Sequence, residues 1–455
     1  MDREEIKKLQ QADKDCIWHP FTQMKLYSEE TPVIIEWGKG SWLYDIEGNA
    51  YLDGISSLWT NMHGHGKDAL DEALKTQTDL LAHSTLLGLS NVPAVRFAQK
   101  LLEIVPPGLT RVFYSDSGST AAEIALKMAF QYHRQSPLGN PRKRKFLTFV
   151  NAYHGDTIGS VSLGGIDLFH EMYHDLLFDT YKVASPYCYR CPYEEQYPEC
   201  NMTCLAAAGK ILADHHDEIA AVVLEPLVQG AAGILVQPDG FVRGVRELCD
   251  RYDVFMIADE VAVGFGRTGK MFACQHEGVT PDIMCLAKGI SGGYLPLAAT
   301  LTKEKIFAGF WGEARENKTF FHGHTYTGNP LACAAAIASL ELFAKENIIA
   351  RIQSSIALLR EKLAAFRDLS HVGDIRQKGL MAGIELVANR ETKENFPPEQ
   401  RIGHQVIMEA RKRGVIIRPL GDVIVLMPHL GMSLDELEML CRVTYESVRA
   451  VTEKT

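Results

Sequence analysis

The segment CLAKGISGGYLPLAA, residues 285–299, places one lysine, Lys288, among glycines and apolar residues. No acidic residue lies within several positions of Lys288 on either side. Burying an ammonium group without a partner costs free energy unless the group releases its proton. This lysine therefore either extends to solvent, as most lysines do, or is a neutral amine that can attack a carbonyl carbon.

Short apolar runs flank this segment and recur through the middle of the chain, separated by stretches with helical periodicity. Strands that alternate with helices form a mostly parallel sheet covered on both faces, so the sequence predicts an α/β fold. The predicted strands are RVFYS (111–115), KFLTFV (145–150), AAVVLEP (220–226), VFMIADE (254–260), DIMCLA (282–287) and LAATLT (297–302).

Two further blocks complete the chain of 455 residues, which is long enough for more than one domain. Residues 33–55 alternate short apolar and turn-forming pieces and predict a small β-meander. An Ala-rich helix is expected from Asn329, followed by an α+β region. We expect an N-terminal segment (1–70) that packs with the small domain, a large domain (71–330) and a smaller C-terminal α+β domain (331–455).

The segment YSDSGSTAAEIALKM, starting at Tyr114, predicts a strand that ends at Ser115, a turn, and a helix from about Thr120. Free N–H groups at a helix start, together with the hydroxyls of Ser117 and Ser119, suit a phosphate group. The same hydroxyls are equally typical of ordinary helix caps. Taken alone, this motif is explained by capping.

A third motif, MIADEVAVGFGRTGKMFA, delivers Asp259 and Glu260 at the end of an apolar strand, where open α/β sheets bind their ligands. A carboxylate there can hold a protonated ring nitrogen, or it can be a solvated acid. The phosphate cradle, the acid and Lys288 follow one another on the same α/β unit. They match the needs of pyridoxal 5'-phosphate: a phosphate anchor, a partner for the pyridine nitrogen and an amine for the aldehyde.

From WHPFTQM at Trp18 to IIRPLGD ending at Asp422, the chain resembles the class III pyridoxal-phosphate aminotransferases, which have fold type I. The run DEV-x-x-GFGRTG, followed by PDI and the lysine of LAKGISGGYLP, carries most of this resemblance. It implies that Lys288, Asp259 and Tyr153 are catalytic. The cofactor-binding residues it implies are Ser117, Gly118, Ser119, Tyr153, Asp259, Lys288, His324 and Thr325.

The segment HGHTYTGNPLAC, from His322, is similar to the part of such enzymes that reaches the neighbouring subunit. On this resemblance Thr325 completes the phosphate site of the partner. The resemblance therefore implies a homodimer with two shared active sites.

Within the family, the segments WHPFTQM, ISSLWTNMHGHG and AYHGDTIGSVSLGG resemble the branch that converts 8-amino-7-oxononanoate to 7,8-diaminononanoate in biotin biosynthesis. Arg418 would bind the terminal carboxylate of that substrate, and Trp59 would line its apolar chain. The substrate-binding residues implied are Phe21, Trp59, Tyr153, Lys288, Gly323 and Arg418.

Three positions depart from the usual pattern of that branch. Phe21 stands where tyrosine is common, Leu58 where tryptophan is common, and His324 where proline is common. The first two changes remove a hydroxyl and an aromatic face that a bulky sulfonium donor would contact. They favour lysine over S-adenosylmethionine as the amino donor. Another ω-aminotransferase, acting on a diamine or β-amino acid, and a non-catalytic protein that keeps only the fold are the alternatives.

Composition and charge give no support for a nucleic-acid-binding, membrane or secreted protein. A net charge of -10 gives no reason to expect nucleic acid or a membrane surface as a partner. The N-terminus MDREEIKKLQ lacks the apolar core of a signal peptide, and no apolar run is long enough to span a bilayer. Ten cysteines in such a chain suggest reduced thiols and a cytoplasmic protein.

Four cysteines form a separate pattern, CYRCPYEEQYPECNMTC, with Cys188, Cys191, Cys200 and Cys204 in a CxxC…CxxxC arrangement. Four thiols at such spacing can hold zinc or an iron–sulfur cluster. The loop between the pairs is shorter than in common zinc modules, and the run resembles a surface insertion. The sequence therefore favours no metal here.

Overall fold

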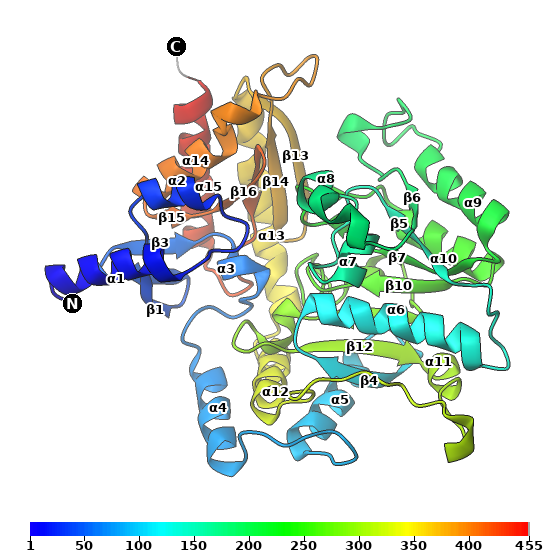
Figure 1. Ribbon diagram of the computed structural model, residues 1–455. Coiled ribbons are helices and arrows are strands. Elements are labelled where there is room, and N and C mark those ends of the chain that lie inside the picture. Colours follow the sequence, from blue (N-terminus) through cyan, green and yellow to red (C-terminus); the bar gives the residue numbers. More distant parts are fainter. Residues whose placement is uncertain (454–455) are drawn as a thin grey trace.

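The computed structural model describes residues 1–453 and is built around a seven-stranded sheet, shown in Figure 1. The strand order is β4-β12-β11-β10-β7-β5-β6. Only β12 runs antiparallel to its neighbours, so the sheet is mostly parallel, as predicted. The strands are β4 (Leu109–Ser115), β5 (Lys145–Phe149), β6 (Tyr181–Val183), β7 (Ile219–Leu224), β10 (Phe255–Asp259), β11 (Ile283–Leu286) and β12 (Ala298–Lys303).

All six strands predicted in this region are present, and β6 is an additional edge strand. Helices cover both faces of the sheet, because alternate residues of each buried strand join different cores. On β7, Ala221 and Val223 pack with helix α6 (Gly118–Gln135), whereas Val222 and Leu224 pack with α9 (Thr203–His215) and α10 (Phe241–Arg251). The all-apolar sequence of β7 follows from this burial on two sides.

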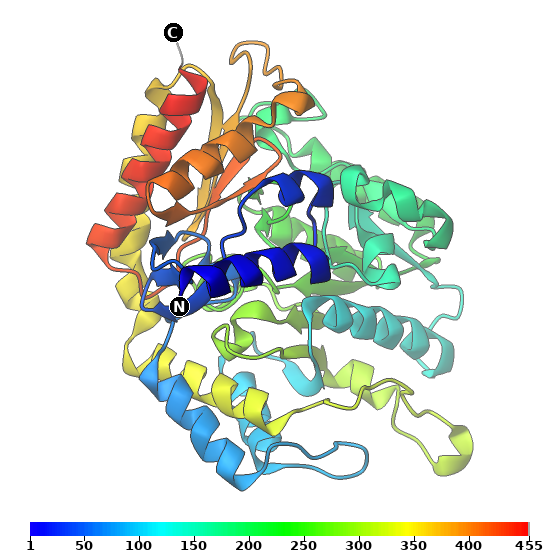
Figure 2. The same cartoon turned by 60° about the vertical axis from the view of Figure 1, so that its left-hand side comes forward.

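The predicted N-terminal meander is confirmed as β1 (Ile35–Lys39), β2 (Trp42–Asp45) and β3 (Ala50–Asp53). A fourth strand, β15 (Val415–Ile416), lies in the predicted C-terminal α+β region and pairs in parallel with β3, a pairing that the sequence did not predict. The N-terminal segment thus shares a sheet with the C-terminal part of the chain. In Figure 2 the N-terminal helices lie beside this C-terminal block.

The C-terminal block has its own sheet, in the order β13-β14-β17-β16. Its strands are β13 (Val372–Lys378), β14 (Met381–Leu386), β16 (Arg418–Leu420) and β17 (Val423–Leu426). The hairpin β8 (Val228–Gln229) and β9 (Leu235–Val236) stands apart from both. We propose that the chain divides functionally into the segments predicted from sequence, 1–70, 71–330 and 331–455.

The Ala-rich helix expected from Asn329 is α12 (Pro330–Lys345). The side chain of Asn329 caps it by accepting a hydrogen bond from the N–H of Ala332 at 3.0 Å, and Pro330 follows at the first helical position. Among the helices of residues 1–453, none is long and apolar enough to cross a membrane. The remaining helices are α1 (Arg3–Cys16), α2 (Met24–Glu29), α3 (Ser56–Trp59), α4 (Asp68–Leu80), α5 (Val92–Ile104), α7 (Ile158–Leu163), α8 (Asp167–His170), α11 (Glu304–Ala308), α13 (Ile348–Ala364), α14 (Ile402–Lys412) and α15 (Leu434–Thr452).

Candidate active site

A cavity of about 780 Å³ lies where the carboxyl ends of the central strands meet the N-terminal segment and the C-terminal sheet. Open α/β sheets bind ligands at this edge. Nine residues that the sequence assigned to the site line it: Phe21, Trp59, Ser117, Gly118, Ser119, Tyr153, Asp259, Lys288 and Arg418. Three predicted residues, Gly323, His324 and Thr325, do not line it.

Asp259 is the last residue of β10 and is 5% exposed. Its carboxylate accepts a hydrogen bond from His154 Nδ1 at 2.7 Å and one from the N–H of Val261 at 3.0 Å. Burial opposes a charge on His154, but the hydrogen bond and the negative charge of Asp259 outweigh it and raise the pKa of the imidazole. These contacts fix the carboxylate at the strand end, so it is a pre-oriented partner for a positively charged group.

Lys288 follows β11 and opens a single turn of 3-10 helix, Lys288–Ser291. Its φ of 46° lies in the left-handed region, which non-glycine residues adopt mainly where function or packing requires it. The ammonium position lies 4.8 Å from the ring centre of Trp59. Burial lowers the pKa of Lys288, although Asp259 and Glu225 act in the opposite direction. This shift favours the neutral amine, the second of the two alternatives that the sequence left open.

The start of α6 forms another wall of the cavity. Ser117 is the N-cap, and its hydroxyl accepts a hydrogen bond from the N–H of Thr120 at 3.3 Å. Ser119 shares a hydrogen bond of 2.8 Å with Thr157. The N–H groups of Gly118 and Ser119 have no partner among residues 1–453, as expected in the first turn of a helix. Ser117 therefore caps the helix, while the next two N–H groups can receive an anion.

Arg418, the first residue of β16, faces the cavity from the C-terminal sheet. Among residues 1–453 it forms no ion pair, and burial lowers the pKa of its guanidinium group. Tyr153, in the loop after β5 of the large sheet, also lines the cavity and donates a hydrogen bond to Asp156 Oδ2 at 2.7 Å. An unpaired guanidinium in a largely apolar cavity suits the carboxylate of a long substrate.

The sequence analysis missed Glu225, which lines the cavity and is 5% exposed. Its carboxyl oxygens accept hydrogen bonds from the N–H groups of Tyr153 at 3.1 Å and Gly230 at 2.8 Å. Burial raises the pKa of Glu225 to about 7. A sequence signal for Glu225 existed: it stands near the end of the predicted strand AAVVLEP, as Asp259 stands near the end of VFMIADE.

The comparisons with known proteins agree with this geometry. The family model of the class III aminotransferases matches residues 24–445. The chain belongs to this family. It is a pyridoxal-phosphate-dependent transaminase with the α/β architecture of fold type I.

Individual relatives cover almost the whole chain. A protein of Nitratidesulfovibrio vulgaris, named adenosylmethionine-8-amino-7-oxononanoate aminotransferase, is 58% identical over 98% of this chain and 82% of its own length. The crystal structure of the Methanocaldococcus jannaschii protein of the same name is 46% identical with a TM-score of 0.93, covering 98% of this chain and 99% of its own. A thermostable omega transaminase from Pseudomonas jessenii is 33% identical with a TM-score of 0.92, covering 98% and 99%.

The residues of the cavity fit pyridoxal phosphate. Gly118 lets the start of α6 approach Val261 closely, because a Cβ atom there would lie only 2.6 Å from Val261 Cγ1. The Nε2 atom of His154 is buried without a hydrogen-bond partner behind Asp259. Together with the amine of Lys288, these features provide an anion site, a fixed carboxylate and a nucleophile in one cavity.

Proposed function

We propose that the chain converts 8-amino-7-oxononanoate to 7,8-diaminononanoate in biotin biosynthesis, with S-adenosylmethionine as the amino donor. The observation that carries the proposal is the unpaired Arg418 in an apolar cavity beside Lys288, in a chain whose relatives are named for this substrate and donor. The relatives of Geobacter sulfurreducens and Staphylococcus aureus, at 55% and 47% identity, carry the same name.

Pyridoxal phosphate supplies an aldehyde that exchanges amines and a ring that takes up negative charge. The neutral amine of Lys288 removes the proton from the amine-bearing carbon of the donor and later delivers a proton to carbon 7 of the acceptor. Asp259, oriented by His154, holds a proton on the pyridine nitrogen. The free N–H groups of Gly118 and Ser119 bind the phosphate.

On the substrate side, Arg418 binds the terminal carboxylate of the acceptor and thereby sets which end of the chain faces Lys288. Trp59, which is 6% exposed, and Tyr153 line the apolar part of the substrate. Phe21 contacts Phe169 edge to face at 5.4 Å between ring centres, and both rings line the cavity. This arrangement suits a long molecule with one acidic end.

Lysine is the second candidate donor, favoured by two side chains at the cavity. Phe21 offers no hydroxyl, and Leu58 offers no aromatic face; their exposed fractions are 58% and 48%. The donor is tested by product formation from 8-amino-7-oxononanoate with each donor supplied separately. Product with S-adenosylmethionine alone supports the proposed donor, whereas product with lysine alone rejects it and retains the pathway.

The broader alternative is a class III ω-aminotransferase that acts on another diamine or a β-amino acid, and the similarity to the Pseudomonas jessenii structure supports it. In that case neither donor yields diaminononanoate. The enzyme would then aminate simple ketones while its cofactor absorbance remains normal. The same assay therefore separates the two functions.

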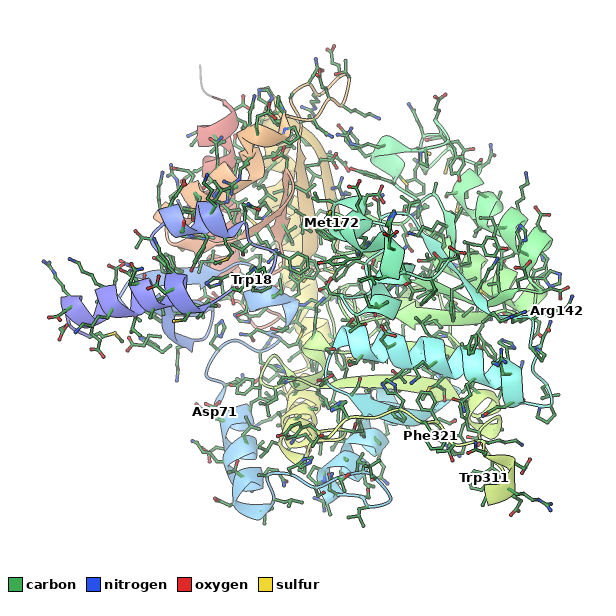
Figure 3. The ribbon with its side chains drawn as sticks, viewed as in Figure 1. Trp18, Asp71, Arg142, Met172, Trp311 and Phe321 are labelled. Atoms are coloured by element: carbon green, nitrogen blue, oxygen red, sulfur yellow. The ribbon has the colours of Figure 1, made fainter. Side chains whose placement is uncertain are left out.

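We also propose a homodimer that shares its active sites. Gly323 and Thr325 are exposed, and His324 lies near the start of α6, with its Nε2 atom 3.9 Å from Asp116 Oδ1. Figure 3 shows Phe321 and Trp311 projecting outward from the chain below α6, and both are more than two-thirds exposed. A partner would cover these apolar side chains and receive Thr325 at its phosphate site.

Mixing two inactive variants tests this arrangement. A shared site predicts that a Lys288→Ala chain and a Thr325→Ala chain recover activity when they form mixed dimers, because one site then has both intact residues. No recovery in mixed dimers of proven composition would reject the sharing. We further propose a cytoplasmic location, supported by ten cysteines that form no disulfide.

A further inference from the structure

Four cysteines converge on one small cavity that is separate from the active site. Cys188, Cys191, Cys200 and Cys204 all line a cavity of about 20 Å³ between β6 and α9. The two pairs come from different elements, since Cys188 begins a 3-10 turn and Cys204 lies in the first turn of α9. The other walls are mainly prolines and tyrosines: Pro186, Pro192, Pro238, Tyr187 and Tyr197.

The side chains around this cavity are of the kind that bind soft cations. Within residues 1–453, no lysine or arginine lines it and Glu195 is its single carboxylate. Glu195 already accepts hydrogen bonds from the hydroxyl and N–H of Thr203 at 2.7 and 3.3 Å. A thiolate there needs a positive charge, and four sulfur donors are the ligand set typical of structural zinc.

The volume separates a single ion from a cluster. A space of about 20 Å³ accommodates one atom the size of a water molecule, not several irons and sulfides. The short loop between the cysteine pairs, which argued against metal in the sequence, is less of an obstacle in the structure. The chain folds back between the two pairs and places all four residues around one space.

The cysteine loop also contacts the C-terminal sheet. Arg190 donates hydrogen bonds to Glu385 Oε1 at 2.8 Å, to the carbonyl of Lys393 at 2.6 Å and to Asn395 Oδ1 at 2.8 Å. Glu385 lies on β14, in the sheet whose strand β16 begins with Arg418. The position of this loop is therefore linked to one wall of the active site.

We propose that Cys188, Cys191, Cys200 and Cys204 bind one Zn²⁺ ion, which fixes the loop against the C-terminal sheet. Among residues 1–453, no three side chains of His, Cys, Asp or Glu already stand together as a preformed metal site. Binding therefore draws the four thiolates inward, until each Zn–S distance is about 2.3 Å. The zinc would lie outside the catalytic cavity, since the two cavities have no lining residue in common in the part of the chain that the structure describes.

Elemental analysis of the full-length, untagged enzyme tests the proposal directly. We expect one zinc per chain after purification, or after incubation with ZnCl₂ and removal of free metal. In competition with a chromophoric chelator, Cys191→Ser and Cys200→Ser should weaken zinc binding by at least about 100-fold. Cys16→Ser, which changes an exposed cysteine of α1, should leave it unchanged. Iron with sulfide, or no retained zinc, would overturn the proposal.

A second measurement uses the unmutated enzyme, so that a failure of the variants to fold does not decide the result. Limited proteolysis is followed within residues 184–203 with and without a zinc chelator, while the cofactor absorbance reports the intact active site. We expect cleavage to become at least about tenfold faster after chelation, because an unligated loop opens more often. Equal rates would show that any zinc present is adventitious, and would reject the structural role.

Discussion

The wall of the cavity formed by the large sheet and the wall formed by the N-terminal segment hold their side chains differently. Asp259 is nearly buried and receives two hydrogen bonds within its wall, whereas Phe21 is more than half exposed and contacts a single ring. Reaction chemistry needs groups fixed to fractions of an ångström, while substrate selection tolerates looser contacts. The carboxylate of Asp259 is therefore held in place by contacts within the chain, whereas Phe21 has room to adjust to a substrate.

The largest effect is expected where the fixed wall loses its nucleophile. Lys288→Ala should reduce turnover by on the order of 10⁴-fold or more, because among residues 1–453 no other amine lines the cavity. The cofactor should also no longer become attached to the chain on borohydride reduction. Lys270→Ala, at an exposed lysine on the GFGRTG segment, is the control. Turnover and attachment that survive in Lys288→Ala would remove the central residue of the mechanism.

Asp259→Asn should lower kcat by roughly 10²–10⁴-fold, because an amide cannot hold the proton on the pyridine nitrogen. The matched control is Glu260→Gln, which changes the next residue of the chain. Glu260 is fully buried, but it accepts hydrogen bonds from the N–H groups of Ala273 and Cys274 and does not line the cavity. Equal losses of kcat in both variants would indicate damage to the strand end instead of lost chemistry.

A change at Arg418, on the wall formed by the C-terminal sheet, should affect substrate binding more than the chemical step. Arg418→Ala should raise the KM for 8-amino-7-oxononanoate by about 10–100-fold, the value of a charged hydrogen-bonded pair, with a much smaller change in kcat. An acceptor whose carboxylate is esterified should bind Arg418→Ala and the unmutated enzyme equally well. Arg413→Ala, which removes a surface ion pair with Glu409, should leave KM unchanged. An unaltered KM in Arg418→Ala would reject its carboxylate role.

The smallest effect concerns stability and pH. The pKa of Glu225 is raised from its usual 4.5 to about 7, so the folded protein binds this proton more tightly than the unfolded chain. The contribution of this proton to the free energy of unfolding is fully present below pH 4.5 and is lost as the pH rises through 7. Glu225→Gln should remove that loss. The difference in Tm between the variant and the unmutated protein should therefore change by about 1–2 °C from pH 5 to pH 7.5. A pH-independent Tm difference would contradict the raised pKa.

The wall formed by the large sheet and the wall formed by the C-terminal sheet also differed in how well the sequence predicted them. Asp259 and Lys288 end or follow apolar strands, and strand ends of a parallel sheet meet at one edge, so local patterns placed them correctly. Arg418 was assigned through family resemblance alone, because its approach to the cavity depends on pairing between β16 and β17. The pairing of β15 with β3 was not predicted for the same reason: two residues carry no periodicity, and the partner strand lies near the other end of the chain.

The pairing of β15 with β3 has a consequence for biosynthesis of the protein. Residues 50–53 leave the ribosome early, yet their edge partner at 415–416 is among the last segments made. During translation β3 is an unpaired strand edge, which favours intermolecular association. The Arg418 wall of the cavity cannot form until this late strand arrives. A nascent chain can thus complete its large sheet well before it acquires a substrate site, and truncation near the C-terminus would leave a folded core without one.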